Sequence, residues 1–244
     1  MADITSYLVG GAVRDNLLGK PTKDYDYTVV VTDVPTIEWA WTGMRDHLIE
    51  EGFEIFLETP EYFTIRARFP KNHPNRKITA DFVLARKEGP YSDGRRPDWV
   101  KVGTLEDDIL RRDFTVNALA ETEDGTVIDL TSGIADLADR RLRAVGDPGE
   151  RLTEDALRAF RAVRFAITKS FTIDDDLAEA MRTVRVLHAL ETNISAERIK
   201  DELHRCFAFD SVETIRFLVK AFPEYLTIME RKGIWLEPTM KGRK

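Results

Sequence analysis

Two aspartates separated by one residue stand at the start of an apolar stretch. Asp24 and Asp26 lie in KDYDYTVV, whose aromatic and β-branched residues predict a strand over 25–30. Side chains at i and i+2 of a strand point to the same side, so the two carboxylates project together. A divalent cation relieves their repulsion, and a pair of such ions suits phosphoryl chemistry. The alternative is two solvated aspartates, the commoner meaning of this motif alone.

A glycine turn precedes this strand. Gly10 and Gly11 separate a short predicted strand over 6–9 from a predicted helix over 13–18. Glycine lets the backbone approach a ligand closely, and free N–H groups at a helix N-terminus favour phosphate. A tight turn without any ligand has the same sequence. In combination with the aspartate pair, however, the turn predicts a phosphate cradle beside a metal site.

A third carboxylate and a basic run follow. Asp81 lies inside the apolar segment ITADFVL, where a charge is costly unless it is paired or bound to a metal. It either completes the metal site or faces water on an edge strand. In RRDFTVNA, on a predicted helix, Arg112 can bind phosphate and Asp113 can accept hydrogen bonds from sugar hydroxyls. A solvated face with a local ion pair is the usual meaning of such a run.

The segment LTEDALRAFRAVRFA carries charges at helical spacing. Glu154 and Asp155 lie one turn from Arg158 on the predicted helix, and Arg161 extends the same side. Cytosine and adenine present an amino donor beside a ring-nitrogen acceptor, whereas uracil and guanine present a carbonyl beside a ring N–H. An Asp–Arg pair therefore selects C and A over U and G. Ordinary salt bridges on a surface helix are the commoner alternative.

The elements that must position these residues divide the chain in two. Strands and helices alternate first, and helical periodicity dominates after 146–149. We therefore predict an α/β domain over 1–145 and an all-helical domain over 146–244. The predicted strands cover 6–9, 25–30, 53–57, 62–69, 77–84, 126–130 and 142–145. The predicted helices cover 13–18, 36–51, 105–120, 151–168, 174–190, 195–209 and 212–222, and 86–97 is a predicted loop.

Composition excludes several classes of protein. The 244 residues include one cysteine, Cys206, which excludes a disulfide scaffold and makes a cysteine zinc site implausible. The four histidines have no ligand spacing, and no serine or cysteine nucleophile arrangement is present. We expect a cytoplasmic protein with no membrane contact, because no signal sequence or apolar run of membrane length is found. The net charge of −7 argues against strong non-specific binding to nucleic acid.

Four motifs in order make the chain similar to a known family. LVGGAVRDNLLG, KDYDYTVV, RRDFTVNALA and LTEDALRAFRAVRFA resemble the class II tRNA nucleotidyltransferases, the CCA-adding enzymes, and bacterial poly(A) polymerases of the same family. The resemblance covers roughly residues 7–210. It implies an α/β head with a polymerase-β-like nucleotidyltransferase mixed sheet, followed by a helical neck. Family members usually continue with body and tail helices, so the resemblance implies a short form that lacks most of both.

The resemblance also implies a role for each motif. Asp24 and Asp26 would be catalytic and hold Mg²⁺, while Asp81, by its place in an apolar strand, is the candidate for a third ligand. The turn and Arg14 would contact the triphosphate, Arg112 and Asp113 the sugar, and the EDxxR strip would act as a protein template for the base. The loop over 86–97 would assist the switch from C to A addition. The implied nucleotide-binding residues are Gly10, Gly11, Arg14, Arg112, Asp113, Asn117, Glu154, Asp155, Arg158 and Arg161.

The expected function is template-independent RNA nucleotidyl transfer. The 3′-hydroxyl of a tRNA attacks the α-phosphate of CTP or ATP and releases pyrophosphate, which gives CCA addition or repair. A poly(A) polymerase and a partial CC- or A-adding enzyme are the alternatives within this chemistry. A non-catalytic nucleotide- or RNA-binding module and a toxin-like transferase acting on protein or a small molecule lie outside it. The intact aspartate pair counts against the former, and the EDxxR strip counts against both.

Overall fold

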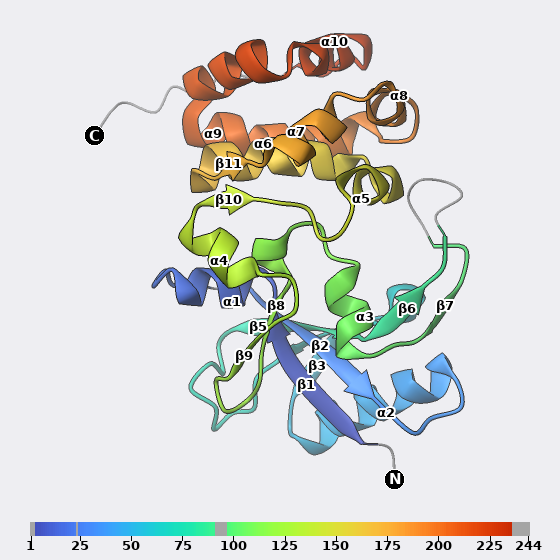
Figure 1. Ribbon diagram of the computed structural model, residues 1–244. Helices are drawn as coiled ribbons and strands as arrows, with labels where there is room; N and C mark the ends of the chain where they lie inside the picture. Colours follow the sequence, from blue (N-terminus) through green and yellow to red (C-terminus); the bar gives the residue numbers. More distant parts are fainter. Residues whose placement is uncertain (1–2, 23, 91–96, 236–244) are drawn as a thin grey trace. The chain divides into compact units, whose positions relative to one another are not determined.

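The computed structural model describes residues 3–22, 24–90 and 97–235 (Figure 1). Their contacts separate two compact units, one of residues 3–90 with 97–135 and one of residues 136–235. Each unit is described by itself below. The two units divide after residue 135. The functional division of the chain after residue 145 stays a prediction.

A mixed sheet of seven strands forms the first unit, with the order β3-β4-β5-β2-β1-β8-β9. β2 and β5 run parallel, and all other neighbours are antiparallel. This sheet confirms the predicted mixed α/β head. Its strands are β1 (Ile4–Val9), β2 (Tyr25–Val31), β3 (Glu54–Thr59), β4 (Thr64–Arg68), β5 (Thr79–Leu84), β8 (Leu119–Glu121) and β9 (Val127–Asp129).

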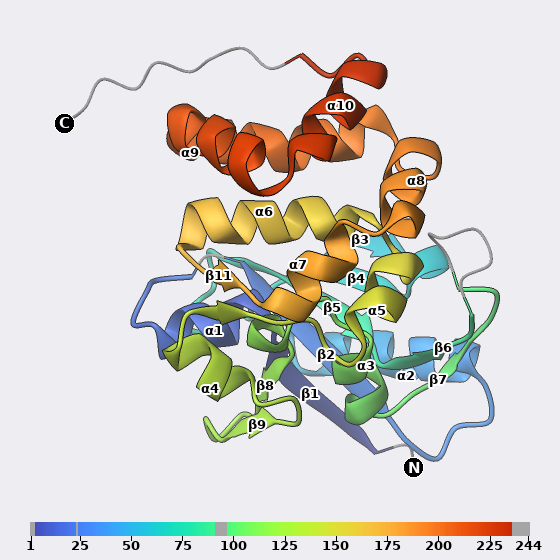
Figure 2. The ribbon, with the colours of Figure 1, turned by 45° about the horizontal axis from the view of Figure 1, so that its top comes forward.

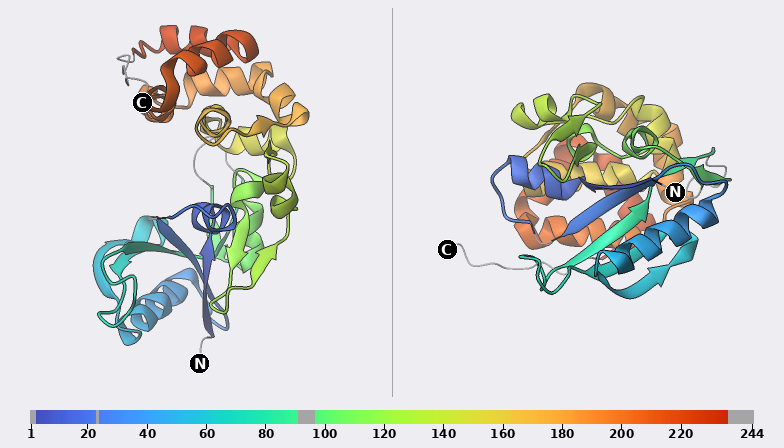
Figure 3. Two further views of the ribbon diagram at one scale, coloured as in Figure 1. Left: turned by 90° about the vertical axis from the view of Figure 1, so that its left-hand side faces the viewer. Right: turned by 90° about the horizontal axis from the view of Figure 1, so that it is seen from below.

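Alternation along β2 assigns its side chains to two faces. Helix α2 (Ile37–Glu50) packs against one face, where Val29, Phe82 and Met44 belong to one buried cluster (Figure 3). Thr36 caps this helix by accepting a hydrogen bond from the backbone N–H of Trp39. Since the strand period is two, residues 26 and 28 point to the face opposite α2. The polar side chains of β2 therefore share a face that α2 does not cover.

The predicted helix over 105–120 is wrong beyond its first half. Helix α3 covers Leu105–Leu110 and begins with a capping box between Thr104 and Asp107. A 3₁₀ turn over Thr115–Asn117 follows, and the chain then enters β8. Leu119 and Ala120 are fully buried, and β8 pairs with β1. Pairing in the sheet thus overrides the helical spacing of FTVNALA.

Short elements also depart from the prediction. The predicted loop over 86–97 begins as strand β6 (Arg86–Glu88), which pairs with β7 (Val100–Val102), and its residues 91–96 lie outside the described chain. Helix α1 covers Gly11–Leu17, as expected from the glycine turn. Helix α4 (Gly133–Ala138) was not predicted.

Six helices form most of the second unit (Figure 2): α5 (Pro148–Glu154), α6 (Leu157–Lys169), α7 (Asp175–Met181), α8 (Val184–Thr192), α9 (Ala196–Ala221) and α10 (Pro223–Arg231). Strands β10 (Arg141–Leu142) and β11 (Thr172–Ile173) pair beside them in parallel. α6 and α9 lie side by side, and both contribute fully buried residues such as Phe160 and Leu203. No helix of the described residues is long and apolar enough to cross a membrane.

Polar side chains interrupt the helices of the second unit, twice where the sequence predicts a continuous helix and once where it predicts a break. Asp155 is extended (φ −147°, ψ 101°) and accepts from the N–H of Leu157, so one predicted helix becomes α5 and α6. Thr183 likewise caps α8 and separates it from α7. α9 bends at Asp210 (φ −154°, ψ 101°), between the two predicted helices over 195–209 and 212–222. Pro223 opens α10, a first-turn position that proline tolerates.

Candidate active site

The aspartate pair lies where β2 begins. Asp26 is the second residue of the strand, and Asp24 directly precedes it. Both residues are exposed, and neither carboxylate forms a hydrogen bond or ion pair with another described residue. Backbone groups of Asp24 bond the hydroxyl of Thr22 at 3.1 and 3.3 Å, which fixes the approach to the strand. Among the described residues, no lysine or arginine is thus bound to either of the two acidic side chains.

Asp81 lies opposite Asp26 in the parallel pairing of β2 and β5. Arg66 on β4 holds it with two bonds, Nε to Oδ1 at 2.6 Å and Nη2 to Oδ2 at 2.7 Å. β5 is an interior strand, so the interpretation of Asp81 as an edge-strand residue is wrong. Although Asp26 is exposed as a residue, partial loss of solvent around its carboxylate raises its pKa, and the Asp81 carboxylate raises it further, while Arg112 and Arg66 oppose the shift.

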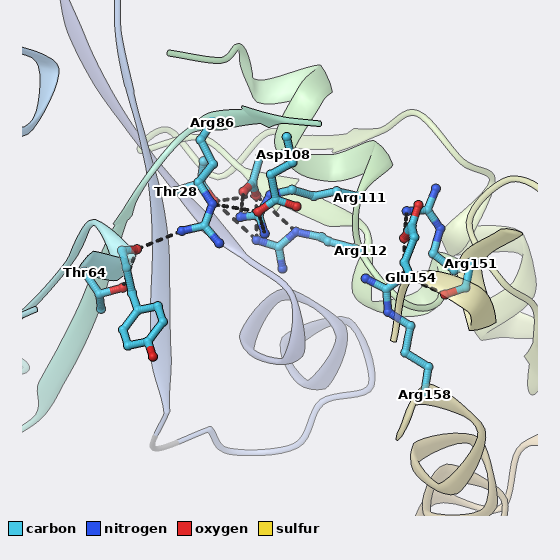
Figure 4. A network of polar contacts seen from close by, with 11 residues as sticks. Thr28, Thr64, Arg86, Asp108, Arg111, Arg112, Arg151, Glu154 and Arg158 are labelled. Atoms are coloured by element: carbon cyan, nitrogen blue, oxygen red, sulfur yellow. Dashed lines mark hydrogen bonds and ion pairs between the residues drawn. The ribbon is translucent and has the colours of Figure 1, made fainter. Parts of the chain in front are cut away.

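A fully buried carboxylate, Asp108 on α3, joins the same sheet face to the basic motif (Figure 4). The hydroxyl of Thr28, two residues after Asp26, donates to its Oδ2 at 2.7 Å, and Nη2 of Arg112 donates to the same oxygen at 2.8 Å. Arg111 pairs with the other oxygen. Burial alone would raise the pKa of Asp108, but the two guanidinium groups and the Thr28 hydroxyl hold it well below its usual range.

The network continues to the neighbouring β-ribbon. Arg111 lies 3.5 Å from Glu88 on β6, and Nε of Arg86 donates to the same Glu88 oxygen at 2.7 Å. Arg86 also donates from Nη1 to the carbonyl oxygen of Tyr62 at 2.8 Å. Two arginines therefore share one buried carboxylate, and the ribbon is tied to the end of α3.

The glycine turn lies next to Arg112. Gly10 has φ +69°, a region that side chains rarely adopt, and a Cβ atom there would stand 2.9 Å from Nη1 of Arg112. Gly11 begins α1. Arg14 on that helix is buried, and its guanidinium donates to Oδ1 of Asn117. Nδ2 of Asn117 then donates to Oδ1 of Asp113 at 3.0 Å. The fold therefore connects these six nucleotide-binding candidates of the first unit: Gly10, Gly11, Arg14, Arg112, Asp113 and Asn117.

Sequence reasoning missed Thr28 and Asp108. The period of the strand places Thr28 on the face of Asp26, so alternation was a usable signal. Asp108 precedes Arg112 by four residues on a helix, a spacing typical of an ion pair. Its complete burial and its bond to a strand 80 residues away have no counterpart in the sequence.

Asp108→Asn is expected to lower the free energy of unfolding by about 3–5 kcal/mol, because breaking a buried ion pair leaves guanidinium groups uncompensated. The folded pKa lies below the ordinary value of about 3.9, so the ionised carboxylate stabilises the fold above that pH. This contribution is lost as the pH falls towards the folded pKa. Urea unfolding should thus give a wild-type advantage that is constant from about pH 7 to about pH 5 and shrinks below about pH 4.

Thr28→Val serves as the graded comparison, because it removes one hydrogen bond to the same oxygen and should cost about 1 kcal/mol. An Asp108→Asn cost no larger than that of Thr28→Val would contradict the buried ion pair. A difference from wild type that does not change with pH would contradict the lowered pKa.

The second unit holds the EDxxR strip, and the pairs differ from those of one continuous helix. Oε2 of Glu154 accepts from Arg151 at 2.7 Å and from Arg158 at 2.6 Å (Figure 4). Asp155, beyond the end of α5, accepts instead from Nη2 of Arg198 at 2.7 Å. Arg161 lies 3.9 Å from Glu202 on α9. Each residue of the strip is thus held by a neighbour within this unit.

No ready-made metal cage is present within residues 3–22, 24–90 and 97–235, in the sense of three or more histidine, cysteine or acidic side chains converging on one point. Asp26 and Asp81 are paired in the register of β2 and β5, and Asp24 precedes Asp26 by two residues, but Asp81 forms an ion pair with Arg66. The role of these residues as metal ligands therefore stays a prediction.

Residues 6–143 match the family model of the Poly A polymerase head domain. The chain belongs to this family. The match confirms the resemblance found in the sequence. Among curated relatives, the CCA-adding enzyme of Levilactobacillus brevis is 40% identical over 238 residues, covering 96% of this chain and 51% of the relative. The CCA-adding enzyme of Streptococcus suis is 40% identical over 199 residues, covering 81% and 44%.

Solved structures agree with the family. The CCA-adding enzyme of Bacillus stearothermophilus in complex with CTP has a TM-score of 0.68 at 28% identity, covering 95% of this chain and 49% of that one. A tRNA nucleotidyltransferase complexed with a primer tRNA and an incoming ATP analog has a TM-score of 0.69 at 27% identity, covering 94% and 59%. The chain spans about half the length of the curated relatives it matches.

Proposed function

We propose that this chain is a template-independent RNA nucleotidyltransferase that adds C, A or both from CTP and ATP to the 3′ end of a tRNA and releases pyrophosphate. The observation that carries this proposal is the aspartate pair at the start of β2, beside the Thr28–Asp108–Arg112 network. The names of the relatives support the same reaction, because CCA-adding enzymes are about 40% identical to this chain.

The acidic residues fit a divalent cation. Asp26 faces Asp81 across two parallel strands, and burial with this second carboxylate raises the pKa of Asp26. Carboxylate oxygens are the ligands that Mg²⁺ prefers, and a cation there offsets the repulsion. Asp24 and Asp26 would hold Mg²⁺, with Asp81 as a third ligand when it leaves Arg66. The bound ions would lower the pKa of the attacking 3′-hydroxyl and stabilise the leaving pyrophosphate.

The nucleotide would lie along the first unit. Arg112, held by Asp108 and Thr28, presents its guanidinium beside Gly10, and the absence of a side chain at Gly10 makes room for this guanidinium. From there Arg112 would reach the sugar, and the backbone of the glycine turn would contact the triphosphate. Arg14 would reach the same phosphates from α1. Asp113, aligned by Asn117, would accept hydrogen bonds from the ribose. Each group is positioned by buried polar contacts before the nucleotide arrives, which reduces the cost of ordering it.

The second unit would choose the base. Asp155 would accept from the amino group of cytosine or adenine, and Arg158 would donate to the ring nitrogen. Glu154 orients Arg158, and Arg198 orients Asp155. Arg161 would help to hold α6 or the phosphates. In this proposal residues 1–145 are the transferase head and residues 146–244 include the helical neck, in a cytoplasmic protein.

An extension assay tests the function. The protein is incubated with Mg²⁺, with CTP, ATP, GTP or UTP singly and CTP with ATP together, and with tRNA transcripts lacking CCA, ending in C or ending in CC. With single nucleotides, we expect CTP to add C to the first two transcripts and ATP to add A to the third. With CTP and ATP together, each transcript should be completed to CCA. A long ladder with ATP alone would instead identify a poly(A) polymerase.

The same assay separates the remaining outcomes. Addition of C only, or of A only, would identify a partial enzyme with the same chemistry. Binding of CTP without any extension of the three transcripts would contradict transfer and favour a non-catalytic module. EDTA must abolish extension, and excess Mg²⁺ must restore it.

A further inference from the structure

The second unit contains a pocket that the proposed chemistry does not use. It has a volume of about 590 Å³ and lies where α7 and the second half of α9 end. Three basic side chains and one carboxylate line it. The lining residues are Arg182, Glu213, Arg216, Phe217, Lys220 and Ala221. The pocket therefore carries a local positive charge in a chain whose net charge is −7.

Arg182 is fixed at the rim of this pocket. Its Nη1 donates to the carbonyl oxygen of Ala178 at 2.9 Å, and its Nε donates to that of Ala221 at 3.2 Å. The guanidinium also lies 4.7 Å from the centre of the Phe222 ring. These contacts join the end of α7 to the end of α9, although Arg182 remains exposed. One cation is thus preorganised, which lowers the entropy lost when an anion binds.

Arg216 and Lys220 lack such partners. Both are exposed, and neither side chain forms an ion pair or hydrogen bond with a described residue. They are four residues apart on α9, a spacing at which like charges repel. The helix dipole favours Lys220 in the last turn but does not account for Arg216, one turn earlier. An anion that contacts both would remove the repulsion.

We propose that this pocket binds the sugar–phosphate backbone of the RNA substrate, with Arg182, Arg216 and Lys220 contacting phosphates. The identity of the ligand as RNA rests on the proposed function. The half-buried ring of Phe217, 5.9 Å from that of Phe222, adds an apolar surface for a ribose or base. The second unit, residues 136–235, holds 17 Lys and Arg against 18 Asp and Glu. The positive charge is therefore local to the pocket, at Arg182, Arg216 and Lys220.

The pocket is tested by measuring how tightly the protein binds a fluorescein-labelled tRNA that lacks CCA. Binding is monitored by fluorescence anisotropy in the absence of nucleotide. Arg216→Gln with Lys220→Gln should raise Kd about tenfold near 0.1 M salt. The slope of log K against log salt should fall in magnitude by about 1.4, because each single-strand phosphate contact contributes about 0.7. Lys200→Gln with Arg205→Gln is the matched control, since it removes one exposed lysine and one exposed arginine from the first half of α9. That control should change Kd by less than about twofold.

Equal weakening by the two double variants would overturn the pocket, because it would show general attraction without a site. An unchanged Kd for the pocket variant would overturn it as well. In steady-state transfer, the pocket variant should raise KM for tRNA and leave KM for CTP and kcat unchanged. If wild type transfers CMP but the pocket variant has an unchanged KM for tRNA, the RNA-binding role of the pocket is wrong and the proposed function is supported. If wild type binds tRNA, the pocket variant binds it more weakly and neither transfers CMP, the proposed function is wrong and the RNA-binding role of the pocket is supported.

Discussion

Replacement of both Asp24 and Asp26 by asparagine is expected to abolish transfer of CMP to tRNA, with a loss of roughly 10³-fold or more. Metal ions contribute several kcal/mol of transition-state stabilisation, and each 1.36 kcal/mol is about tenfold in rate. Asparagine keeps the shape of the side chain but removes the negative charge that holds the cation. Both side chains are exposed, so the substitution leaves the core of the sheet intact.

The loss should be measured as single-turnover incorporation of labelled CMP, together with Mn²⁺ binding followed by electron paramagnetic resonance. Asp175→Asn with Asp176→Asn is the matched control, because it neutralises two exposed aspartates on α7. The control should retain both transfer and Mn²⁺ binding. If the Asp24 and Asp26 variant kept more than about a tenth of the wild-type rate, the metal role of the pair would be refuted.

Stability should change in the opposite direction from activity. The pKa of Asp26 is raised by partial desolvation and by Asp81, so the folded state favours the protonated form more than the unfolded chain does. Its contribution to stability is present at low pH and is lost as the pH rises through the folded pKa. At pH 7 without metal, Asp26→Asn should therefore unfold at a higher temperature than wild type. Such a gain in thermal stability on substitution is expected for a carboxylate that is kept for function at a cost in stability.

The sequence predicted the aspartate pair because alternation is a local property. β2 was expected within one residue of its observed end, with Asp26 inside the strand and Asp24 directly before it. The partner strand was not predictable in the same way. Asp81 faces Asp26 only because β5 crosses to lie parallel to β2, and its ion pair with Arg66 needs β4 on the other side. Strand order depends on long-range packing, which no short pattern encodes.

The sites on helices were harder to predict for a related reason. Leu105 to Ala120 has helical spacing, yet the chain leaves the helix after Leu110 and β8 joins the sheet. Asp113 and Asn117 consequently meet Arg14 through a turn instead of along a helix face. The charge pattern of the sequence singled out these polar residues as candidates. Which of their atoms form hydrogen bonds depends on how the turn is buried against α1.

The EDxxR strip shows the same limit at Asp155. The sequence predicted one helix through the strip, with Asp155 one turn from Arg158. The side chain of Asp155 instead bonds the N–H of Leu157 and ends the regular backbone there. Glu154 therefore holds Arg158, while Arg198 on α9 holds Asp155. Acid and base are positioned by two separate partners, so each can be tested without moving the other.

Asp155→Ala with Arg158→Ala is expected to relax base choice before it destroys the rate. One bidentate recognition pair discriminates between bases by about 1–3 kcal/mol, so the preference for CTP over UTP should fall about tenfold to a hundredfold. Discrimination of this kind arises because the wrong base leaves polar groups of the site unpaired. Each Asp155 oxygen already accepts one hydrogen bond and retains a lone pair for the amino group of the base.

Single additions of each of the four nucleotides to a tRNA lacking CCA give kcat/KM for every base. Glu191→Ala with Arg231→Ala is the matched control, because it removes an ion pair of 3.1 Å from the same unit. Glu154→Gln should produce part of the effect, since it weakens the contact that orients Arg158. Full preference for C and A in the Asp155 and Arg158 variant would eliminate the protein template. Base choice would then have to come from the first unit, where Arg112 and Asp113 are the candidates that remain.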